Sequence, residues 1–161
     1  MRPAVDAIQE GERLSANGHH AAAVVFFVTA IEVLLKATVL KPIVHGLVHS
    51  AGLAEVIVEQ ALGQSGFDRY TKLLSKLYRE FSDLDINSIA REGSKQNLLA
   101  ECTGLQSIRN KVIHQGAQCS EEDAALGLLV AIAVYENIVF PVLAALGLTV
   151  IERGVIEARQ L

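Results

Sequence analysis

The residues best suited to chemistry in this chain are Arg109, Asn110 and His114, which lie in one short stretch that ends at Gly116. An arginine offers a planar, permanently charged group that can bind the oxygens of a phosphate in pairs. A histidine gains or loses a proton near neutral pH, so it can act as a general base or a general acid. A guanidinium and an imidazole at one helix end therefore suit the cleavage of a phosphodiester.

The spacing of these residues limits how one helix can present them. Asn110 and His114 are four residues apart and share a face of the helix. Arg109 and His114 are five residues apart, which places them about 140° apart around the helix axis. One helix therefore aligns this pair poorly, and two copies facing each other across a dimer axis would solve the problem.

Glu32 and Lys36 interrupt an apolar segment earlier in the chain and are also four residues apart. Charged side chains on an apolar helix are rarely buried without a partner. In one interpretation they form a salt bridge that reaches solvent, worth only ~0.3–0.5 kcal/mol. In the other they line the active-site cleft, where Glu32 would orient Arg109 or His114 and Lys36 would bind phosphate. Lys111, inside the motif, is a further candidate for binding substrate.

Periodic apolar residues, bounded by helix caps and helix breakers, predict the helices that position these residues. Ser94 is the expected cap of the motif helix and Ser120 that of the last long helix, which Pro141 should kink or break. Glu136 and Asn137 interrupt the last helix, and we expect them to be buried beside another polar group or to face a dimer interface. The expected helices cover residues 4–17, 20–40, 51–62, 67–81 and 94 to about 114–116, with a last helix from 120 and a tail over 149–161 that forms a short strand plus a helix or is frayed.

The composition favours one helical domain. The chain has 161 residues, of which 51% are apolar and 20% charged, with no Trp and with few Gly and Pro. This length is enough to bury a core, and sparse Gly and Pro argue against a many-stranded β protein. We therefore expect an all-α, up-down helical bundle of about five or six helices, forming a single domain over residues 1–161.

Charge is unevenly distributed along the chain, whose net charge is −4. Residues 67–116 contain eight bases and six acids, residues 1–66 four bases and six acids, and residues 117–161 two bases and six acids. The motif thus lies in the only net-basic part of an acidic chain. This suits a local anion site and argues against broad nonspecific coating of nucleic acid. In the other interpretation, which we favour, Lys72, Lys76 and Arg79 only solvate a helix face.

Residues 21–40 and 124–150 form apolar runs long enough to cross a bilayer, which takes about 20 residues. Each run has an ionised side chain near its middle, costing roughly 2.5–3.5 kcal/mol on insertion scales. Buried helices of a soluble protein explain both runs more simply, so we expect no membrane. Without the features of a signal peptide at the N-terminus, we expect a cytoplasmic protein in which Cys102 and Cys119 are reduced structural thiols.

The motif resembles the signature of the HEPN superfamily, in which an Arg, often followed by Asn, precedes a His by four to six residues. The resemblance covers the expected core, about residues 20–145, and is strongest at Arg109, Asn110 and His114. It implies a small all-helical homodimer whose composite cleft takes the motif from both protomers. Many members are metal-independent endoribonucleases of bacterial defence or toxin–antitoxin systems, which would make RNA the substrate and a cognate antitoxin a possible partner.

In such a site the ribose 2′-hydroxyl attacks the adjacent phosphorus while the 5′-oxygen leaves, producing a 2′,3′-cyclic phosphate. His114 would transfer protons, Arg109 would stabilise charge on the phosphate oxygens, and Asn110 would orient His114 or hydrogen-bond the phosphate. The RNA supplies the nucleophile, so we expect no metal and no cofactor. Gly116 stands where toxins paired with minimal nucleotidyltransferases usually carry Tyr, which argues against that particular pairing.

Two other functions fit the same residues. The alternative is a non-catalytic HEPN-like dimeric module that binds a nucleotide, RNA or a partner protein, and a helical membrane or adaptor protein is a third. In a binding module Arg109 and His114 could form a ligand pocket, and in a purely structural interpretation they would only satisfy the last carbonyl groups of a helix. His45 and His49 have the spacing of two metal ligands, but Gly46 and the lack of an acidic partner argue against a metal site.

Overall fold

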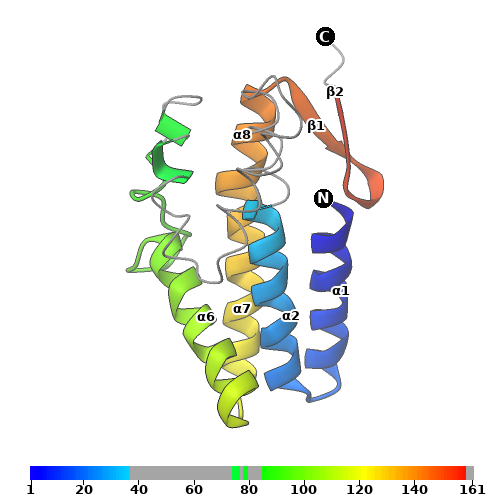
Figure 1. Cartoon of the computed structure of the whole chain (residues 1–161), viewed down its shortest axis with the longest axis vertical. Helices are drawn as coiled ribbons and strands as arrows, with labels where there is room; N and C mark the ends of the chain where they lie inside the picture. The colour runs from blue at the N-terminus through cyan, green and yellow to red at the C-terminus, as the bar shows by residue number, and fades with distance from the viewer. Residues whose placement is uncertain (37–73, 77, 80–84, 159–161) are drawn as a thin grey trace, which may run out of the picture.

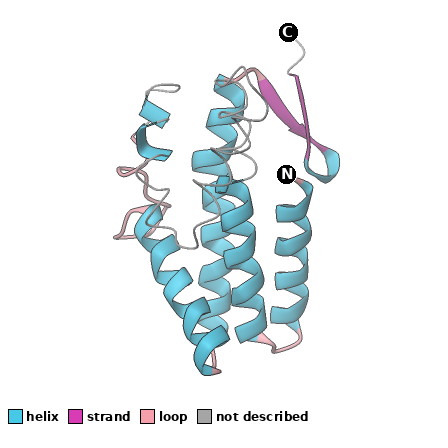
Figure 2. Cartoon of the chain, in the orientation of Figure 1, coloured by secondary structure: helices cyan, strands magenta, loops and turns pink. Residues whose placement is uncertain are grey.

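The computed structural model describes residues 1–36, 74–76, 78–79 and 85–158, and these form a mainly helical fold with one small β-sheet (Figures 1 and 2). The prediction of a mainly helical chain is confirmed. The helices expected over 51–62 and over most of 67–81, and the connector with His45 and His49, lie outside the described residues. The elements are α1 (Arg2–Ala16), α2 (His20–Val33), α6 (Leu98–Gln115), α7 (Glu121–Val134), a π-helical stretch (Tyr135–Val139), α8 (Phe140–Ala145), β1 (Leu148–Ile151) and β2 (Val155–Ala158).

Helix α2 is the central element of the bundle, because it contacts α1, α6 and α7. Figure 1 shows these helices side by side, with α1 and α6 running in one direction and α2 and α7 in the other. The buried residues of α2 cover about half of the helix circumference, whereas Ala22 and Thr29 on the opposite side are exposed. Many buried side chains here and on α7 are alanine or valine, which lets the helix backbones approach closely.

Phe27 of α2 shows how close this approach is. Its ring is fully buried between Gly11 of α1 and Gly127 of α7. A Cβ atom added at Gly11 would lie 2.5 Å from the ring, and one added at Gly127 would lie 3.0 Å from it. The two glycines therefore leave the space that the ring occupies.

Helices α6 and α7 each begin directly after a residue whose side chain caps the helix. Helix α6 begins after Asn97, whose side chain accepts a hydrogen bond from the backbone of Ala100, so the expected cap at Ser94 was wrong. The sequence offers several polar residues there, and only the one in extended conformation directly before the first turn can cap. Ser120 caps α7 as predicted and forms a capping box with Asp123.

The last long helix continues through Pro141 instead of ending there. The π-helical stretch Tyr135–Val139 precedes the proline, and α8 then runs to Ala145. The proline lies in the first turn of α8, where a missing backbone N–H is tolerated. In the π-helical stretch, the Ile138 carbonyl accepts a hydrogen bond of 3.3 Å from the buried hydroxyl of Tyr78.

The two polar residues of this stretch differ from their prediction in part. Glu136 is exposed and therefore not buried beside another polar group, while the alternative that it faces a dimer interface stays a prediction. Asn137 is partly buried and donates to the Ala133 carbonyl of its own helix at 3.1 Å. The outward position of Glu136 follows from the helix period, which turns it away from the buried neighbours Ile138 and Val139.

The C-terminal part forms an antiparallel hairpin, not a strand followed by a helix. Leu148 pairs with Ala158, and Ile151 pairs with Val155. The turn between the strands lies against the start of α1, where a Cβ atom at Gly154 would be 3.0 Å from the Arg2 nitrogen. This small sheet makes the all-α prediction incomplete, because it depends on contacts with α1 and α8 that local sequence does not reveal.

In the part of the chain that the structure describes, one continuous helical run, Glu121–Ala145, is long and apolar enough to cross a membrane. In its most apolar stretch, 44% is buried inside the protein. A core helix of a soluble protein has the same composition. The expected cytoplasmic location therefore stays a prediction.

Candidate active site

The motif occupies the last two turns of α6, as its spacing predicts. The helix ends at Gly116, which adopts a left-handed conformation with φ of 65° and donates its backbone N–H to the Val112 carbonyl. Glycine takes this conformation without the steric cost that other residues meet. The glycine thus fixes where α6 stops and places His114 in its last turn.

Arg109 points toward α2 and forms an ion pair with Glu32. The distance between Arg109 Nη2 and Glu32 Oε1 is 2.5 Å, and the side chains are 22% and 24% exposed. Gln106, one turn earlier on α6, also donates to Glu32 Oε1 at 3.4 Å. The pair is partly desolvated, so solvent screens it less than a surface pair. Glu32 holds the guanidinium in one direction and leaves other N–H groups of the fork unused by this bond.

Glu32 pairs with Arg109 of α6, so it does not form a salt bridge confined to Glu32 and Lys36. The interpretation that Glu32 orients Arg109 in a catalytic cleft stays a prediction. Gln106 was not anticipated as a member of the site. Its position three residues before Arg109, on the same face of the helix, was the signal that sequence offered.

Around the axis of α6, Asn110 lies about 100° and His114 about 140° from Arg109. Both are exposed, and so is Ile113, which lies between them and has 52% of its surface accessible. Positions 110, 113 and 114 share one helix face. In the described residues no hydrogen bond or ion pair links His114 to Arg109 or Glu32. One protomer therefore brings Arg109 and Glu32 together and leaves His114 apart from them.

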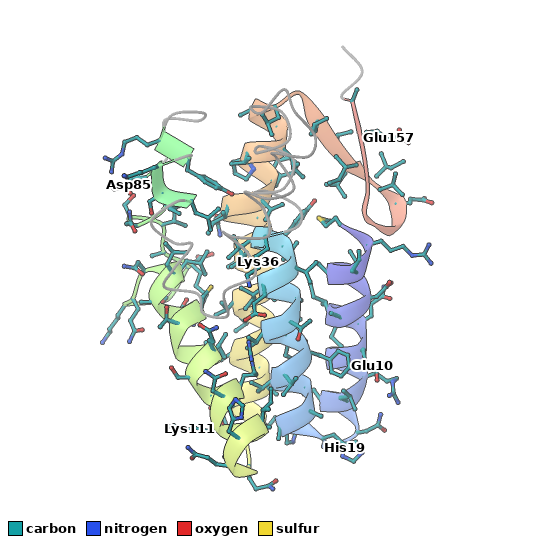
Figure 3. All side chains as sticks on the ribbon, in the orientation of Figure 1. Glu10, His19, Lys36, Asp85, Lys111 and Glu157 are labelled. Atoms are coloured by element: carbon teal, nitrogen blue, oxygen red, sulfur yellow. The ribbon has the colours of Figure 1, made fainter. Side chains whose placement is uncertain are left out.

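The two lysines expected to bind phosphate also lie apart. Figure 3 shows Lys36 near one end of α2 and Lys111 near the opposite end of the bundle, on α6. Lys111 is exposed, and Lys36 is partly buried one turn beyond Glu32. Lys36 lies four residues after Glu32, whereas Lys111 lies three residues before His114 on α6 and shares its face.

The cysteines on either side of the motif are free thiols. Burial raises the pKa of the Cys102 thiol well above its usual range, and burial and the Asp123 charge raise that of Cys119. Neither thiol is therefore activated as a nucleophile. Among the described side chains, no group of three or more His, Cys, Asp or Glu is arranged to hold a metal ion.

The chain was compared with models of known protein families, with curated proteins and with solved structures. None of the three comparisons found a match.

Proposed function

We propose that this protein is a metal-independent endoribonuclease of a toxin–antitoxin or defence system, with an HEPN-like fold and a composite site in a homodimer. The observation that carries the proposal is the Glu32–Arg109 ion pair, which fixes a guanidinium beside the motif helix. An arginine held in place before substrate binds is better suited to stabilise developing charge than one that must first be ordered.

The exposed face of α6 supports the dimeric arrangement. Ile113 is a large apolar side chain at a surface position between two polar residues of the motif. In an isologous dimer the same face meets its own copy, so contact through Ile113 would cover apolar surface and bring two motifs together. His114 of one protomer would then lie near Arg109 of the partner subunit, which overcomes the separation within one helix.

In the proposed reaction, His114, Arg109 and Asn110 have different roles. His114 of one protomer takes the proton of the ribose 2′-hydroxyl as that oxygen bonds to phosphorus. The bond from phosphorus to the 5′-oxygen breaks, and the leaving oxygen takes a proton from solvent. Arg109 stabilises the charge on the non-bridging oxygens throughout, and Asn110 orients the imidazole or the phosphate. The products are a 2′,3′-cyclic phosphate and a free 5′-hydroxyl.

One observation favours the alternative, a non-catalytic dimeric module that binds a nucleotide, RNA or a partner protein. Glu32 neutralises the charge of Arg109, and an arginine already paired attracts a phosphate less strongly. Under this alternative the ion pair joins α2 to α6 and has a structural role. Replacing either partner would then lower stability and leave binding at His114 unchanged.

The first test is incubation of the purified protein with tRNA and mRNA in the presence of EDTA. We expect cleavage that leaves cyclic-phosphate ends, and its loss in His114→Ala and Arg109→Ala. The matched controls are His19→Ala, an exposed histidine at another helix end, and Arg13→Ala, an arginine in an exposed ion pair with Glu10. Absence of cleavage by the folded wild-type protein, or equal cleavage by His114→Ala, would refute the enzymatic proposal.

A mixing experiment tests the composite site. We expect Arg109→Ala and His114→Ala chains to be inactive alone and to recover part of the activity when refolded together. A mixed dimer contains one intact Arg109 and one intact His114 on different chains. Activity that never returns on mixing, although mixed dimers form, would show that the two residues act within one chain.

A further inference from the structure

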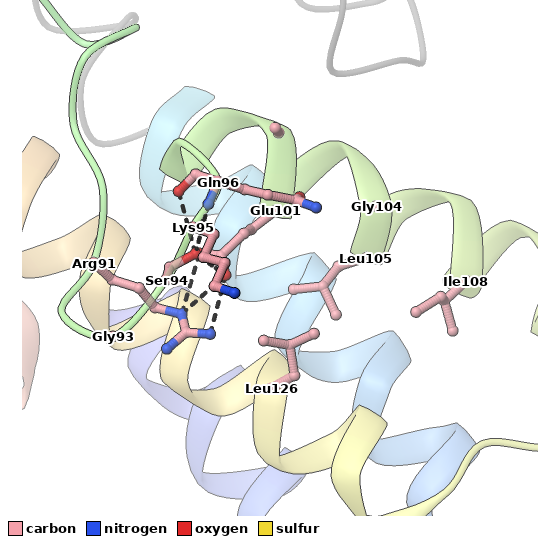
Figure 4. Close-up of a pocket in the computed structure, with 11 residues that line it drawn as sticks. Arg91, Gly93, Ser94, Lys95, Gln96, Glu101, Gly104, Leu105, Ile108 and Leu126 are labelled. Carbon is pink, nitrogen blue, oxygen red and sulfur yellow. Dashed lines mark hydrogen bonds and ion pairs between the residues drawn. The ribbon is translucent and has the colours of Figure 1, made fainter.

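A cavity of about 400 Å³ lies between α6, α7 and the loop before α6. Figure 4 shows that polar side chains gather at the loop end of the cavity and apolar ones along the helices. The apolar wall consists of Leu105, Ile108 and Leu126. None of the motif residues Arg109, Asn110 and His114 lines it. The cavity is open to solvent on one side, and it combines an apolar wall with a few convergent polar groups, as small-molecule sites do.

The polar end of the cavity is rigidly built. Arg91 Nε lies 3.1 Å from both carboxylate oxygens of Glu101, and its Nη2 lies 3.0 Å from Oε1. The Ser94 hydroxyl donates to the same Oε1 at 2.9 Å. Glu101 is only 8% exposed and Arg91 22%. These contacts fix the guanidinium before any ligand arrives, so ordering it adds little to the cost of binding.

The charge at this end favours an anion. Arg91 and Glu101 neutralise each other, which leaves the exposed Lys95 as the net charge among the residues that line the cavity. Lys95 lies at the rim beside the Arg91–Glu101 pair (Figure 4). A negative group on a ligand would therefore meet Lys95 and the outer N–H groups of Arg91.

Gly104 gives an independent indication that another molecule approaches this side of α6. It lies in the interior of the helix, where glycine is less favourable than alanine. Its φ is not positive, and a Cβ atom added there would meet no atom of the described residues within 4 Å. Packing and backbone conformation thus give no reason for glycine at this position. A ligand lying on the exposed backbone of α6 would give one, because glycine permits close approach.

We propose that this cavity binds a small amphipathic organic anion. An apolar ring or chain would lie over Gly104 and against Leu105, Ile108 and Leu126, and a carboxylate, phosphate or sulfonate group would meet Lys95 and Arg91. The site is separate from the motif, and the inference holds whether or not the protein cleaves RNA.

The test uses three probes with the intact protein: anilinonaphthalene sulfonate, octanoate and inorganic phosphate. Binding is followed by fluorescence for the first and by backbone amide shifts in ¹H–¹⁵N NMR for all three. We expect the two amphipathic anions to bind saturably, one per chain, and to shift the Gly104 amide. Inorganic phosphate should bind at least about tenfold more weakly, because it lacks the apolar part.

Two variants locate the site. Gly104→Leu places a side chain in the cavity and should weaken binding by about tenfold or more, while Ser107→Leu adds the same side chain to an exposed position of α6 outside the cavity and should leave binding unchanged. Lys95→Gln should weaken binding several-fold and reduce its dependence on salt. Since Lys95 is exposed, this variant serves even where Gly104→Leu perturbs folding.

Three results would overturn the proposal. The first is unchanged binding to both Gly104→Leu and Lys95→Gln. The second is an amide shift confined to another place, such as the apolar cavity beside Val5 and Ile8. The third is phosphate binding as tight as that of octanoate, which would assign an anion site without an apolar part.

Discussion

Three helix glycines, Gly11, Gly104 and Gly127, should respond differently to one substitution, Gly→Ala. The distance from an added Cβ atom to the Phe27 ring is 2.5 Å at Gly11 and 3.0 Å at Gly127. At Gly104 no atom lies within 4 Å. All three lie in helices, so the gain in helix propensity is similar and the steric term decides the order.

The magnitudes follow from these distances. Alanine is more favourable than glycine inside a helix by roughly 0.5–1 kcal/mol, and overpacking a core costs about 1–3 kcal/mol. Gly104→Ala should therefore raise the free energy of unfolding by roughly 0.5–1 kcal/mol. Gly11→Ala should lower it by about 1 kcal/mol, because the Phe27 ring cannot move away without meeting Gly127. Gly127→Ala should fall between the two.

The assay is urea unfolding followed by circular dichroism, with Tm as a second measurement. For a chain of this length, a change of 1 kcal/mol shifts Tm by roughly 2–4 °C. The order of stability should be Gly104→Ala, wild type, then Gly11→Ala. If Gly11→Ala proved as stable as Gly104→Ala, the close packing of Phe27 between α1 and α7 would be refuted. A destabilised Gly104→Ala would show that packing does require that glycine.

Three further predictions concern the helix ends, the π-helical stretch and the thiols. Tyr78→Phe should lower the free energy of unfolding by about 1–2 kcal/mol, because the Ile138 carbonyl loses a buried donor; an unchanged urea midpoint would contradict it. Ser120→Ala should cost about 1 kcal/mol through the lost cap of α7, whereas the same stability as wild type would show that the cap is dispensable. At pH 8 a thiol reagent should label Cys119 before Cys102, because burial raises the pKa of Cys102 and leaves little thiolate; mass spectrometry of labelled peptides checks the order, and equal rates would refute it.

The helices could be predicted where the signal is local. The Asn17–Gly18 turn ends α1, Ser120 begins α7 and Gly116 ends α6, each through a backbone group next to it in sequence. The cap at Asn97 was missed because Ser94, three residues earlier, has an equally suitable side chain. The local sequence does not distinguish between two suitable caps, because the backbone path of the loop determines which of them lies at the start of the helix.

The errors at the C-terminal side have a different physical cause. Pro141 was expected to kink or break the last helix, yet a π-helical stretch precedes it and the proline lies in the first turn of α8, where its missing N–H is tolerated. Strand β1 contacts helix α8, and the turn of the hairpin contacts α1, which lies at the other end of the sequence. Such contacts form only when the bundle is assembled, so periodicity in one segment does not indicate them.

Part of the candidate site could be predicted from the motif helix alone, and part depends on contacts between helices. The positions of Asn110 and His114 on one face follow from helix geometry alone. That Arg109 meets Glu32 required α2 and α6 to pack side by side, and the charged residue in an apolar segment was the only sign of it.

Helix α6 turns its side chains in three directions: Arg109 toward Glu32 of α2, Asn110, Ile113 and His114 toward solvent, and the side of Gly104 toward the cavity. Arg109 and His114 lie about 140° apart around the axis, so a straight helix does not turn both toward one point. The proposed reaction uses both residues and is therefore best served by a second copy of α6, whereas the residues that line the cavity beside Gly104 come from one chain.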